Sequence, residues 1–292
     1  MTITQKNIVL QMLKNFEYNE NYSLKSLNRY RTGGNATFVV FPKSTKDLKV
    51  LVNSLVENEI NYYVLGLGSN VLISDKGFDG VVIVTKFLNK IDVKGNLIIA
   101  ESGAKLIDVI NESLLNSLGG LEFAVGIPAS VGGSVAMNSG CYNKSISERV
   151  SYVVTNKGVY SRQNCQFAYR KSRFLNSEVI LEVCFTMMPD ELDNIEEKLN
   201  QYKSFRKNPK GRNCGSIFKN DGFFAGKIID ECNLKGYSVG QASISIEHAN
   251  FIIAKDNCTS CDIYNLIKDV KEKVYKEKQI ELQEEVVYLG EF

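Results

Sequence analysis

The stretch of sequence that decides the fold covers residues 120–140 and reads GLEFAVGIPASVGGSVAMNSG. Small residues predominate in it, so a flat, bulky ligand can lie against bare backbone, while Pro128 fixes a turn and Asn138 offers an amide. Glycine loses more conformational freedom on folding than any other residue, and packing alone rarely requires so many of them. The stretch therefore predicts a cofactor-binding segment, with a close helix-to-sheet contact as the alternative.

A second glycine-rich segment, Gly66-Leu67-Gly68-Ser69-Asn70, follows a strand that we expect over 62–65. Two glycines flanking one residue let the backbone amides turn inward toward a diphosphate, with Ser69 and Asn70 as side-chain donors. A tight turn without a ligand explains the segment equally well. It is not the dinucleotide fingerprint, because the third glycine is absent and a strand follows instead of a helix. A Rossmann fold is therefore disfavoured.

The composition is that of a folded protein with a small net charge. The chain has 292 residues, is 44% hydrophobic, and carries 35 basic and 33 acidic side chains, a formal charge of +2. This length suggests two domains with room for a third, small one. Because the charges are interspersed, we expect no binding to nucleic acid or to a membrane surface, and any bound phosphate must be held locally. No apolar run approaches the roughly 18 residues that span a bilayer, so we expect a cytoplasmic protein.

The cysteines indicate free thiols in a reducing compartment, because there are seven of them, scattered along the chain. The pair Cys258-x-x-Cys261 invites a zinc or redox interpretation. However, no second pair and no nearby histidine completes a tetrahedral site, and Thr259 and Ser260 have the pattern of a helix cap. We therefore expect no metal.

Helical and strand patterns are mixed along the chain, which predicts an α+β fold with regions at 1–85, 86–195 and 196–292. Ser44 and Thr45 are expected to cap a helix, whose apolar face is Leu48, Leu51, Val52, Leu55 and Val56. Further helices are expected at 105–118, 190–206, 225–232 and 259–278. Strands are expected at 62–65, 71–73, 81–85, 97–100, 150–155, 179–187, 250–254 and 285–289.

Seven motifs along the chain resemble the UDP-N-acetylenolpyruvoylglucosamine reductase family, where they occur in the same order. They are Tyr30-Arg31-Thr32-Gly33-Gly34, LGLGSNVLISDKGFDGVVI at 65–83, GLEFAVGIPASVGGSVAMNSGCYN at 120–143, Tyr169-Arg170-Lys171-Ser172-Arg173-Phe174, Gly215-Ser216-Ile217-Phe218-Lys219-Asn220, Ala225-Gly226-Lys227-Ile228-Ile229, and Glu285-Val286 with Gly290. The resemblance spans roughly residues 25 to 290. Arg170 and Ser216 are only 46 positions apart, so the chain is similar to the short form of the family, which lacks a tyrosine-bearing insertion.

The resemblance implies a two-lobe FAD-binding domain of the vanillyl-alcohol-oxidase (PCMH) type over about 30–195 and a C-terminal α+β substrate-binding domain. Noncovalent FAD is expected, because the flavin-binding half has no histidine to tether it. The implied flavin contacts are Gly66, Leu67, Gly68, Ser69, Asn70, Gly126, Ile127, Pro128, Ser130, Gly132, Gly133, Asn138 and Arg170.

The family's reaction is the NADPH-dependent reduction of UDP-N-acetylenolpyruvoylglucosamine to UDP-N-acetylmuramate, a step in peptidoglycan precursor synthesis. The resemblance places its active-site arginine on Arg170, its proton-donating serine on Ser216 and its glutamate on Glu285. Hydride addition leaves negative charge on the carbon that bears the carboxylate, so a permanently charged arginine suits that carboxylate. A serine hydroxyl suffices as acid because the developing carbanion is strongly basic.

The resemblance also implies substrate contacts at Lys207, Asn220 and His248. A structural histidine is an equally good explanation of His248. The chain departs from the family at Asp221 and Glu284, which stand where proline is common. These departures concern substrate contacts more than flavin binding.

Two other functions remain open at this point. One is a paralogous FAD oxidoreductase acting on another sugar or alcohol, and the other is a flavin-free protein that binds a nucleotide sugar without turnover. In each case the expected partner is a small nucleotide sugar or a related molecule, and we expect a monomer.

Overall fold

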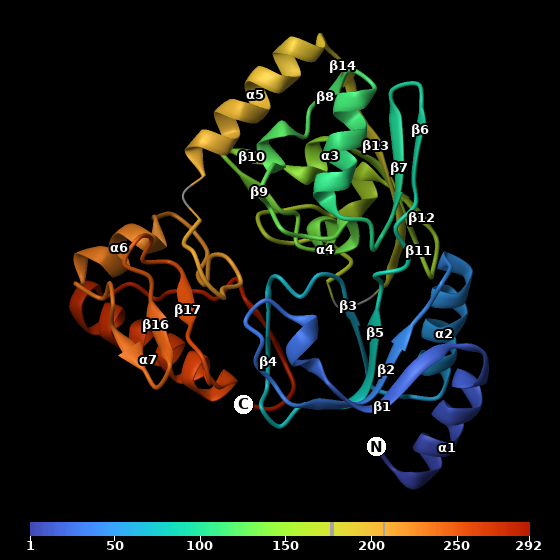
Figure 1. Cartoon of the computed structure of the whole chain (residues 1–292), viewed down its shortest axis with the longest axis horizontal. Helices are drawn as coiled ribbons and strands as arrows, with labels where there is room; N and C mark the ends of the chain where they lie inside the picture. Colours follow the sequence, from blue (N-terminus) through green and yellow to red (C-terminus); the bar gives the residue numbers. More distant parts are fainter. Residues whose placement is uncertain (176–177, 207) are drawn as a thin grey trace. The chain divides into compact units, whose positions relative to one another are not determined.

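A computed structural model describes residues 1–175, 178–206 and 208–292. The chain forms two compact units. Unit 1 comprises residues 1–19, 38–67 and 80–206, and unit 2 comprises residues 20–37, 68–79 and 207–292. Both units contain helices and strands (Figure 1), which confirms the α+β class. The two units divide the chain differently from the three regions expected from the sequence, because unit 2 includes residues 20–37 and 68–79 of the first region. The boundaries of the three regions remain a prediction.

The helices and strands follow one another irregularly along the chain. The helices are α1 Ile3–Met12, α2 Thr45–Glu57, α3 Leu106–Leu115, α4 Val131–Ala136, α5 Leu192–Phe205, α6 Ala225–Glu231 and α7 Ser260–Lys278. The strands are β1 Glu17–Ser23, β2 Asn35–Phe41, β3 Tyr62–Leu65, β4 Val71–Ile73, β5 Phe78–Val84, β6 Ile91–Lys94, β7 Leu97–Glu101, β8 Leu118–Gly119, β9 Gly140–Cys141, β10 Lys144–Ser145, β11 Val150–Thr155, β12 Val159–Ser161, β13 Ile180–Thr186, β14 Met188–Pro189, β15 Ser238–Val239, β16 Ala242–Ile244, β17 Ile252–Ala254 and β18 Val287–Leu289.

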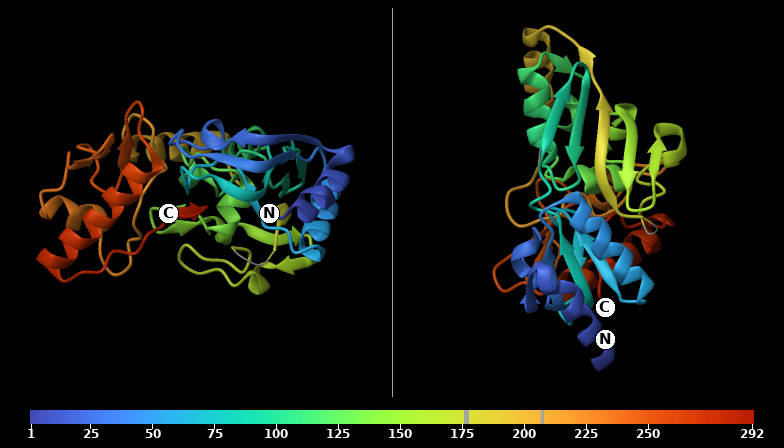
Figure 2. Two further views of the ribbon diagram at one scale, coloured as in Figure 1. Left: turned by 90° about the horizontal axis from the view of Figure 1, so that it is seen from below. Right: turned by 90° about the vertical axis from the view of Figure 1, so that its right-hand side faces the viewer.

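Unit 1 contains a five-stranded antiparallel sheet in the order β12-β11-β13-β7-β6 (Figure 2). Strand residues alternate between the two faces of a sheet, so one face can be apolar throughout. Here that face packs on α3 and α4. The core residues that they share are Ile98, Ala100, Leu106, Val109, Val131, Val135, Val183 and Phe185.

A second apolar cluster of unit 1 surrounds α2 and the parallel pair of β3 and β5. Ser44 caps α2 as expected, because its hydroxyl accepts a hydrogen bond from Asp47 N. Four of the five expected apolar positions of α2 are buried. The fifth, Val56, is 51% exposed, since it lies about 100° around the helix from Leu55, off the buried stripe.

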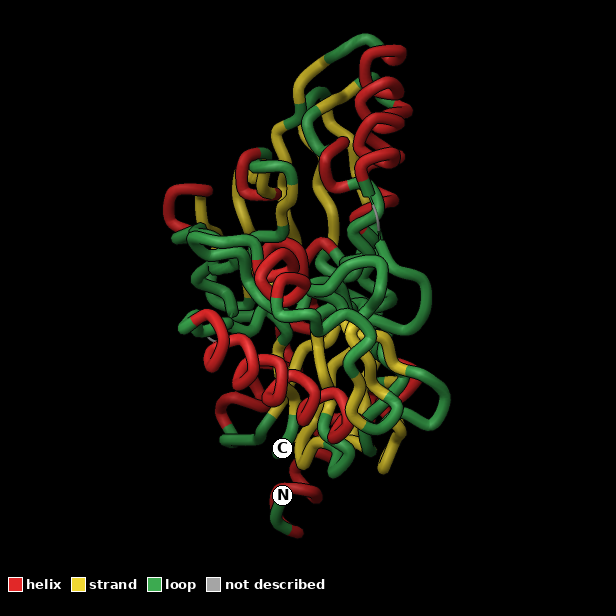
Figure 3. Tube along the Cα trace, turned by 90° about the vertical axis from the view of Figure 1, so that its left-hand side faces the viewer, coloured by secondary structure: helices red, strands yellow, loops and turns green. Residues whose placement is uncertain are grey.

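Unit 2 is built on the three-stranded antiparallel sheet β15-β16-β17, on which α7 packs. The buried face of α7 consists of Ile263, Leu266, Ile267, Val270 and Val274. Strand β18 pairs in parallel with β4, with Val287 opposite Val71. Long loops join these elements (Figure 3).

The structure also corrects two expectations about local structure. The glycine-rich stretch contains the short helix α4. Its sequence does not predict a helix, because glycine disfavours helices. The last strand begins at Val287 and not at residue 285, because Glu285 N bonds to Ile217 O, outside the ladder of β18. Among the described helices, none is long and apolar enough to cross a membrane.

Candidate active site

The first glycine-rich segment follows β3 directly, as expected. A Cβ atom at Gly66 would collide with the Ser130 hydroxyl of the same unit, so a larger residue fits there only if that hydroxyl rotates away. Gly68 has a φ of +58°, a conformation that glycine adopts readily. Among the described residues, the backbone N–H groups of 66–70 donate no hydrogen bond. The segment therefore presents free donors of the kind that bind a diphosphate.

The second glycine-rich segment forms the start of α4. Ser130 is the N-cap of this helix and accepts a hydrogen bond from Gly133 N at 3.2 Å. A Cβ atom at Gly132 would lie 2.9 Å from Ser102 Cβ, and Gly132 N donates to Ser102 O. Close packing thus accounts for Gly66 and Gly132, as in the alternative interpretation. A Cβ atom at Gly133 would likewise face the Ser130 hydroxyl, at 3.2 Å, so the fit of this segment to a flat ring stays a prediction.

These two segments fit the FAD that the sequence leads us to expect. The donors of Gly66 and Leu67 suit its diphosphate, and the meeting of Gly66 with Ser130 joins these two residues to α4 within unit 1. The contacts of residues 66–70, 126–128, 130, 132 and 133 with flavin all stay predictions.

We expect Gly66→Ala to weaken FAD binding. The new methyl group would force the Ser130 hydroxyl to rotate and to lose its bond to Gly133 N, at a cost of about 1 kcal/mol in stability. The ratio of bound flavin to purified protein should fall, and so should the midpoint of urea unfolding. Gly158→Ala is the matched control, because a Cβ there meets no atom closer than 3.8 Å. Wild-type flavin content in Gly66→Ala would contradict this interpretation of the segment.

Arg170 lies in a tight turn of unit 1 between Ala168 and Lys171, which form an isolated antiparallel bridge. The backbone of Arg170 is left-handed, with a φ of +51°. Its Nη2 donates to Gly140 O at 2.9 Å. The predicted catalytic arginine therefore lies against the end of the glycine-rich stretch.

Two other side chains fix the same turn. Asn138 Nδ2 donates to Ala168 O at 2.8 Å, and Ser172 Oγ donates to Ala136 O at 2.7 Å. Asn138 Oδ1 also accepts from Ser147 N. The structure thus gives Asn138 a positioning role, and its contact with flavin stays a prediction.

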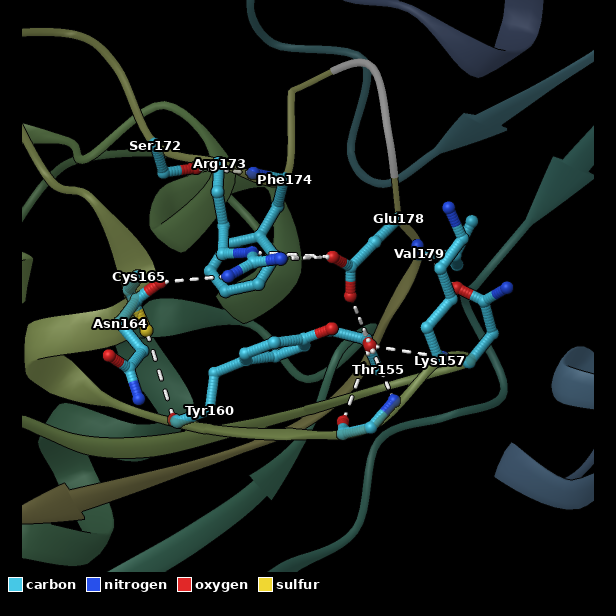
Figure 4. A network of polar contacts seen from close by, with 12 residues as sticks. Thr155, Lys157, Tyr160, Asn164, Cys165, Ser172, Arg173, Phe174, Glu178 and Val179 are labelled. Atoms are coloured by element: carbon cyan, nitrogen blue, oxygen red, sulfur yellow. Dashed lines mark hydrogen bonds and ion pairs between the residues drawn. The ribbon is translucent and has the colours of Figure 1, made fainter.

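A polar network anchors the chain that follows this turn (Figure 4). Arg173 donates from Nε and Nη2 to Glu178 Oε1, and its guanidinium lies 3.9 Å from the centre of the Tyr160 ring. Thr155 Oγ1 donates to Glu178 Oε2 at 2.7 Å. Burial alone would raise the pKa of Glu178, but hydrogen bonds from Thr155, Tyr160 and Arg173 hold it below its usual value. The network is thus an ion pair in which Glu178 is buried and both of its carboxylate oxygens accept hydrogen bonds.

We expect Glu178→Gln to lower the free energy of unfolding by about 2 kcal/mol at pH 7, because a charged acceptor becomes neutral. A carboxylate whose pKa is lowered on folding stabilises the protein above its unfolded pKa, and this stabilisation is lost as the pH falls through the folded value. In urea unfolding, the difference between wild type and variant should therefore shrink only below about pH 4.5.

Glu182→Gln is the control for this measurement. Burial, followed by the charges of Glu101 and Asp92, raises the pKa of Glu182, so its ionised form opposes folding and its removal should not destabilise the protein at pH 7. A difference for Glu178→Gln that persists unchanged to pH 3 would show that its carboxylate is not the source.

Ser216 and Glu285 lie on neighbouring segments of unit 2. Ser216 forms a bridge with Phe251, and the next residue, Ile217, accepts a hydrogen bond from Glu285 N at 2.7 Å. Both residues are half-buried. The structure therefore brings the predicted proton donor and the predicted glutamate together within one unit.

Asn250 holds the segment that carries Ser216, a role that the sequence did not suggest. Its side chain, 1% exposed, accepts from Phe218 N at 2.9 Å and donates to Phe218 O at 2.8 Å. Its backbone oxygen also accepts from Ile217 N. Asn250 lies two residues after His248, in the motif Glu247-His248-Ala249-Asn250-Phe251, and a buried amide next to a strand is the signal for such a role.

The three predicted substrate residues have different surroundings. His248 Nδ1 accepts from Asn250 N at 3.2 Å, its ring lies edge-on to Phe251, and burial lowers the pKa of the imidazole. These contacts are those of a structural histidine. Asn220 Oδ1 accepts from Ala225 N at the start of α6. Lys207 lies outside the described residues.

The helix-cap interpretation of residues 258–261 is confirmed. Thr259 is the N-cap of α7, and its hydroxyl accepts from Asp262 N. Asp75 completes the cap, because its two oxygens accept from Ser260 N and Cys261 N. The residues between the two cysteines thus begin a helix.

Comparison with known proteins gives likenesses along nearly the whole chain. Residues 206–289 match the family model described as the UDP-N-acetylenolpyruvoylglucosamine reductase C-terminal domain, and residues 36–159 match an FAD-binding domain. The UDP-N-acetylenolpyruvoylglucosamine reductase of Clostridium novyi is 39% identical over 285 residues, 94% of this chain and 93% of that protein. The same enzyme of Clostridium kluyveri is 40% identical over 279 residues, 92% and 91% of the two chains.

A solved structure agrees with the sequence relatives. The crystal structure of UDP-N-acetylenolpyruvylglucosamine reductase from Thermus caldophilus superposes with a TM-score of 0.81 at 30% identity, covering 94% of this chain and 99% of that one. The expected FAD-binding fold agrees with this likeness and with the FAD-binding domain match.

Proposed function

The chain belongs to the UDP-N-acetylenolpyruvoylglucosamine reductase family, and on that premise we propose that it reduces UDP-N-acetylenolpyruvoylglucosamine to UDP-N-acetylmuramate in peptidoglycan precursor synthesis. NADPH is the hydride donor, and FAD is bound noncovalently. The observation that carries the proposal is the 39% identity to such a reductase along 94% of the chain. A paralogue for another sugar or alcohol is not favoured, because the identity includes the C-terminal domain as well as the FAD-binding domain.

Bound FAD supplies the hydride chemistry of the reaction. The backbone amides of Gly66 and Leu67 would hold its diphosphate, and the glycine-rich start of α4 would receive its ring. Ser130, which caps α4, would keep this segment in place. Flavin binding is thus assigned largely to backbone, in segments whose glycines also allow close packing.

Arg170 binds the carboxylate of the substrate in this proposal. Its guanidinium is planar and permanently charged, so it stabilises the negative charge that develops beside that carboxylate when the double bond is reduced. The turn bonded by Asn138 and Ser172 fixes its backbone. Preorganisation of this kind saves the cost of ordering the side chain during the reaction.

Ser216 donates the proton to the carbon that bears the carboxylate. Its hydroxyl is a weak acid, so its effectiveness rests on placement. Asn250 supports that placement through Phe218, two residues further along the chain. Glu285 polarises the carboxylate or orients a water molecule beside it.

The remaining assignments concern the cell and the assembly. We place the protein in the cytoplasm as a monomer that serves cell-wall synthesis, and hence cell shape and division. Its substrate is a soluble nucleotide sugar, which fits a site formed by local donors in a chain with a net charge of only +2.

Ser216→Ala should separate the two half-reactions. In anaerobic stopped-flow measurements, flavin reduction by NADPH should stay within about twofold of wild type. Reoxidation by the enolpyruvyl substrate should slow by roughly two to four orders of magnitude, the usual contribution of a positioned general acid. Ser238→Ala, at an exposed serine of β15, should change neither rate. Equal losses in both half-reactions would contradict the role of Ser216 as proton donor.

A further inference from the structure

Arg206 lies beside the glycine-rich stretch, although no sequence pattern marks it. It follows α5 as its C-cap residue. Its side chain passes over Gly126, where an added Cβ atom would lie 2.7 Å from its Cδ and 3.1 Å from its Nε. Its Nη2 donates to Cys141 Sγ at 3.2 Å. All these residues belong to unit 1.

The charge of Arg206 is not balanced by an anion among the described residues. Within the described part of the chain, Arg206 forms no ion pair. Its Nε is buried and has no hydrogen-bond partner there. Its one side-chain partner is a thiol, and burial raises the pKa of Cys141 in spite of Arg206 and Arg170, so the thiol stays neutral. Arg206 is therefore a half-buried cation with an N–H group that lacks a hydrogen-bond partner among the described residues. Such a group favours an anionic ligand.

Arg170 reaches the same place from another segment. Its Nη2 bonds to Gly140 O, next to the residue that Arg206 contacts, and both guanidinium groups act on the Cys141 thiol. The two guanidinium groups repel each other at this distance. A bound anion would attract both of them and offset the repulsion. Tyr142, Tyr202 and Phe205 pack on one another beside Arg206, with ring centres 5.3 to 6.3 Å apart. They provide an apolar flank that would limit screening by water.

We propose that Arg206, together with Arg170, binds an oxyanion of the reductase's ligands. The site takes a carboxylate or a phosphate, because both match the planar fork of a guanidinium. Three sources have this chemistry: the substrate carboxylate, the diphosphate of the nucleotide sugar, and the 2′-phosphate of NADPH. This inference rests on the proposed function, which supplies these ligands.

The test compares Arg206→Gln with wild type, both loaded with FAD, by calorimetric titration with four non-reducing probes. UDP-N-acetylmuramate carries a carboxylate and a diphosphate, UDP-N-acetylglucosamine carries only the diphosphate, and NADP+ differs from NAD+ by the 2′-phosphate. We expect at least one oxyanion probe to bind about tenfold or more weakly to the variant. Loss for UDP-N-acetylmuramate alone identifies the carboxylate, equal loss for both UDP-sugars identifies the diphosphate, and loss for NADP+ but not NAD+ identifies the 2′-phosphate.

Three further variants keep the result interpretable. Arg162→Gln makes the same substitution at an exposed arginine of unit 1 and should bind every probe like wild type. Cys141→Ala removes only the thiol and should also bind within about twofold. Arg206→Lys keeps the charge but loses the planar fork of the guanidinium, so its affinity for the probes should lie between those of wild type and Arg206→Gln. It takes the place of Arg206→Gln if that variant does not fold or loses FAD.

The inference is overturned if Arg206→Gln, or Arg206→Lys in its place, binds all four probes within twofold of a wild-type protein that does bind them. That result would leave the proposed function intact. Failure of wild type itself to bind UDP-N-acetylmuramate would instead remove the proposed function, and the assignment of Arg206 with it.

Discussion

The close approach of Gly66 to Ser130 is the constraint on which the rest of the site in unit 1 depends. A Cβ atom at Gly66 would collide with the Ser130 hydroxyl, so the end of β3 can meet the start of α4 without displacing this hydroxyl only if the first residue after the strand is glycine. Ser130 caps α4, and the chain beyond this helix leads to residues 136–140, which accept the hydrogen bonds of the turn that carries Arg170. One steric requirement thus links the segment suited to a diphosphate to the segment that presents a cation.

The two units carry different parts of the chemistry. Unit 1 contributes the backbone donors of Gly66 and Leu67 and the cations Arg170 and Arg206, and its buried acid Glu178 is already paired with Arg173. Unit 2 contributes a hydroxyl and a carboxylate, Ser216 and Glu285, on segments joined by backbone hydrogen bonds. A reduction that adds a hydride and a proton to an anionic substrate needs both sets: cations to hold the negative charge and a placed hydroxyl to supply the proton.

Periodic patterns predicted the fold best where local and tertiary preferences coincide. The face of α2, the cap of α7 and the strand after Asn70 all agree with the structure, because the local pattern and the tertiary contacts favour the same conformation there. The helix α4 was missed because glycine disfavours helices, and here packing against Ser102 outweighs that preference. Glu285 was placed in a strand because its sequence alternates, although its backbone bonds to Ile217 instead.

The sequence by itself determined the α+β class, the family resemblance and the two glycine-rich segments, since each is written in residues that stand close together in the chain. Only the tertiary structure decided which side chains support the reacting groups. Asn250 bonds to Phe218 across 32 positions, and Arg206 bonds to Cys141 across 65. No local pattern encodes such pairs, because a hydrogen bond between distant residues depends on where the whole backbone brings its donor and acceptor.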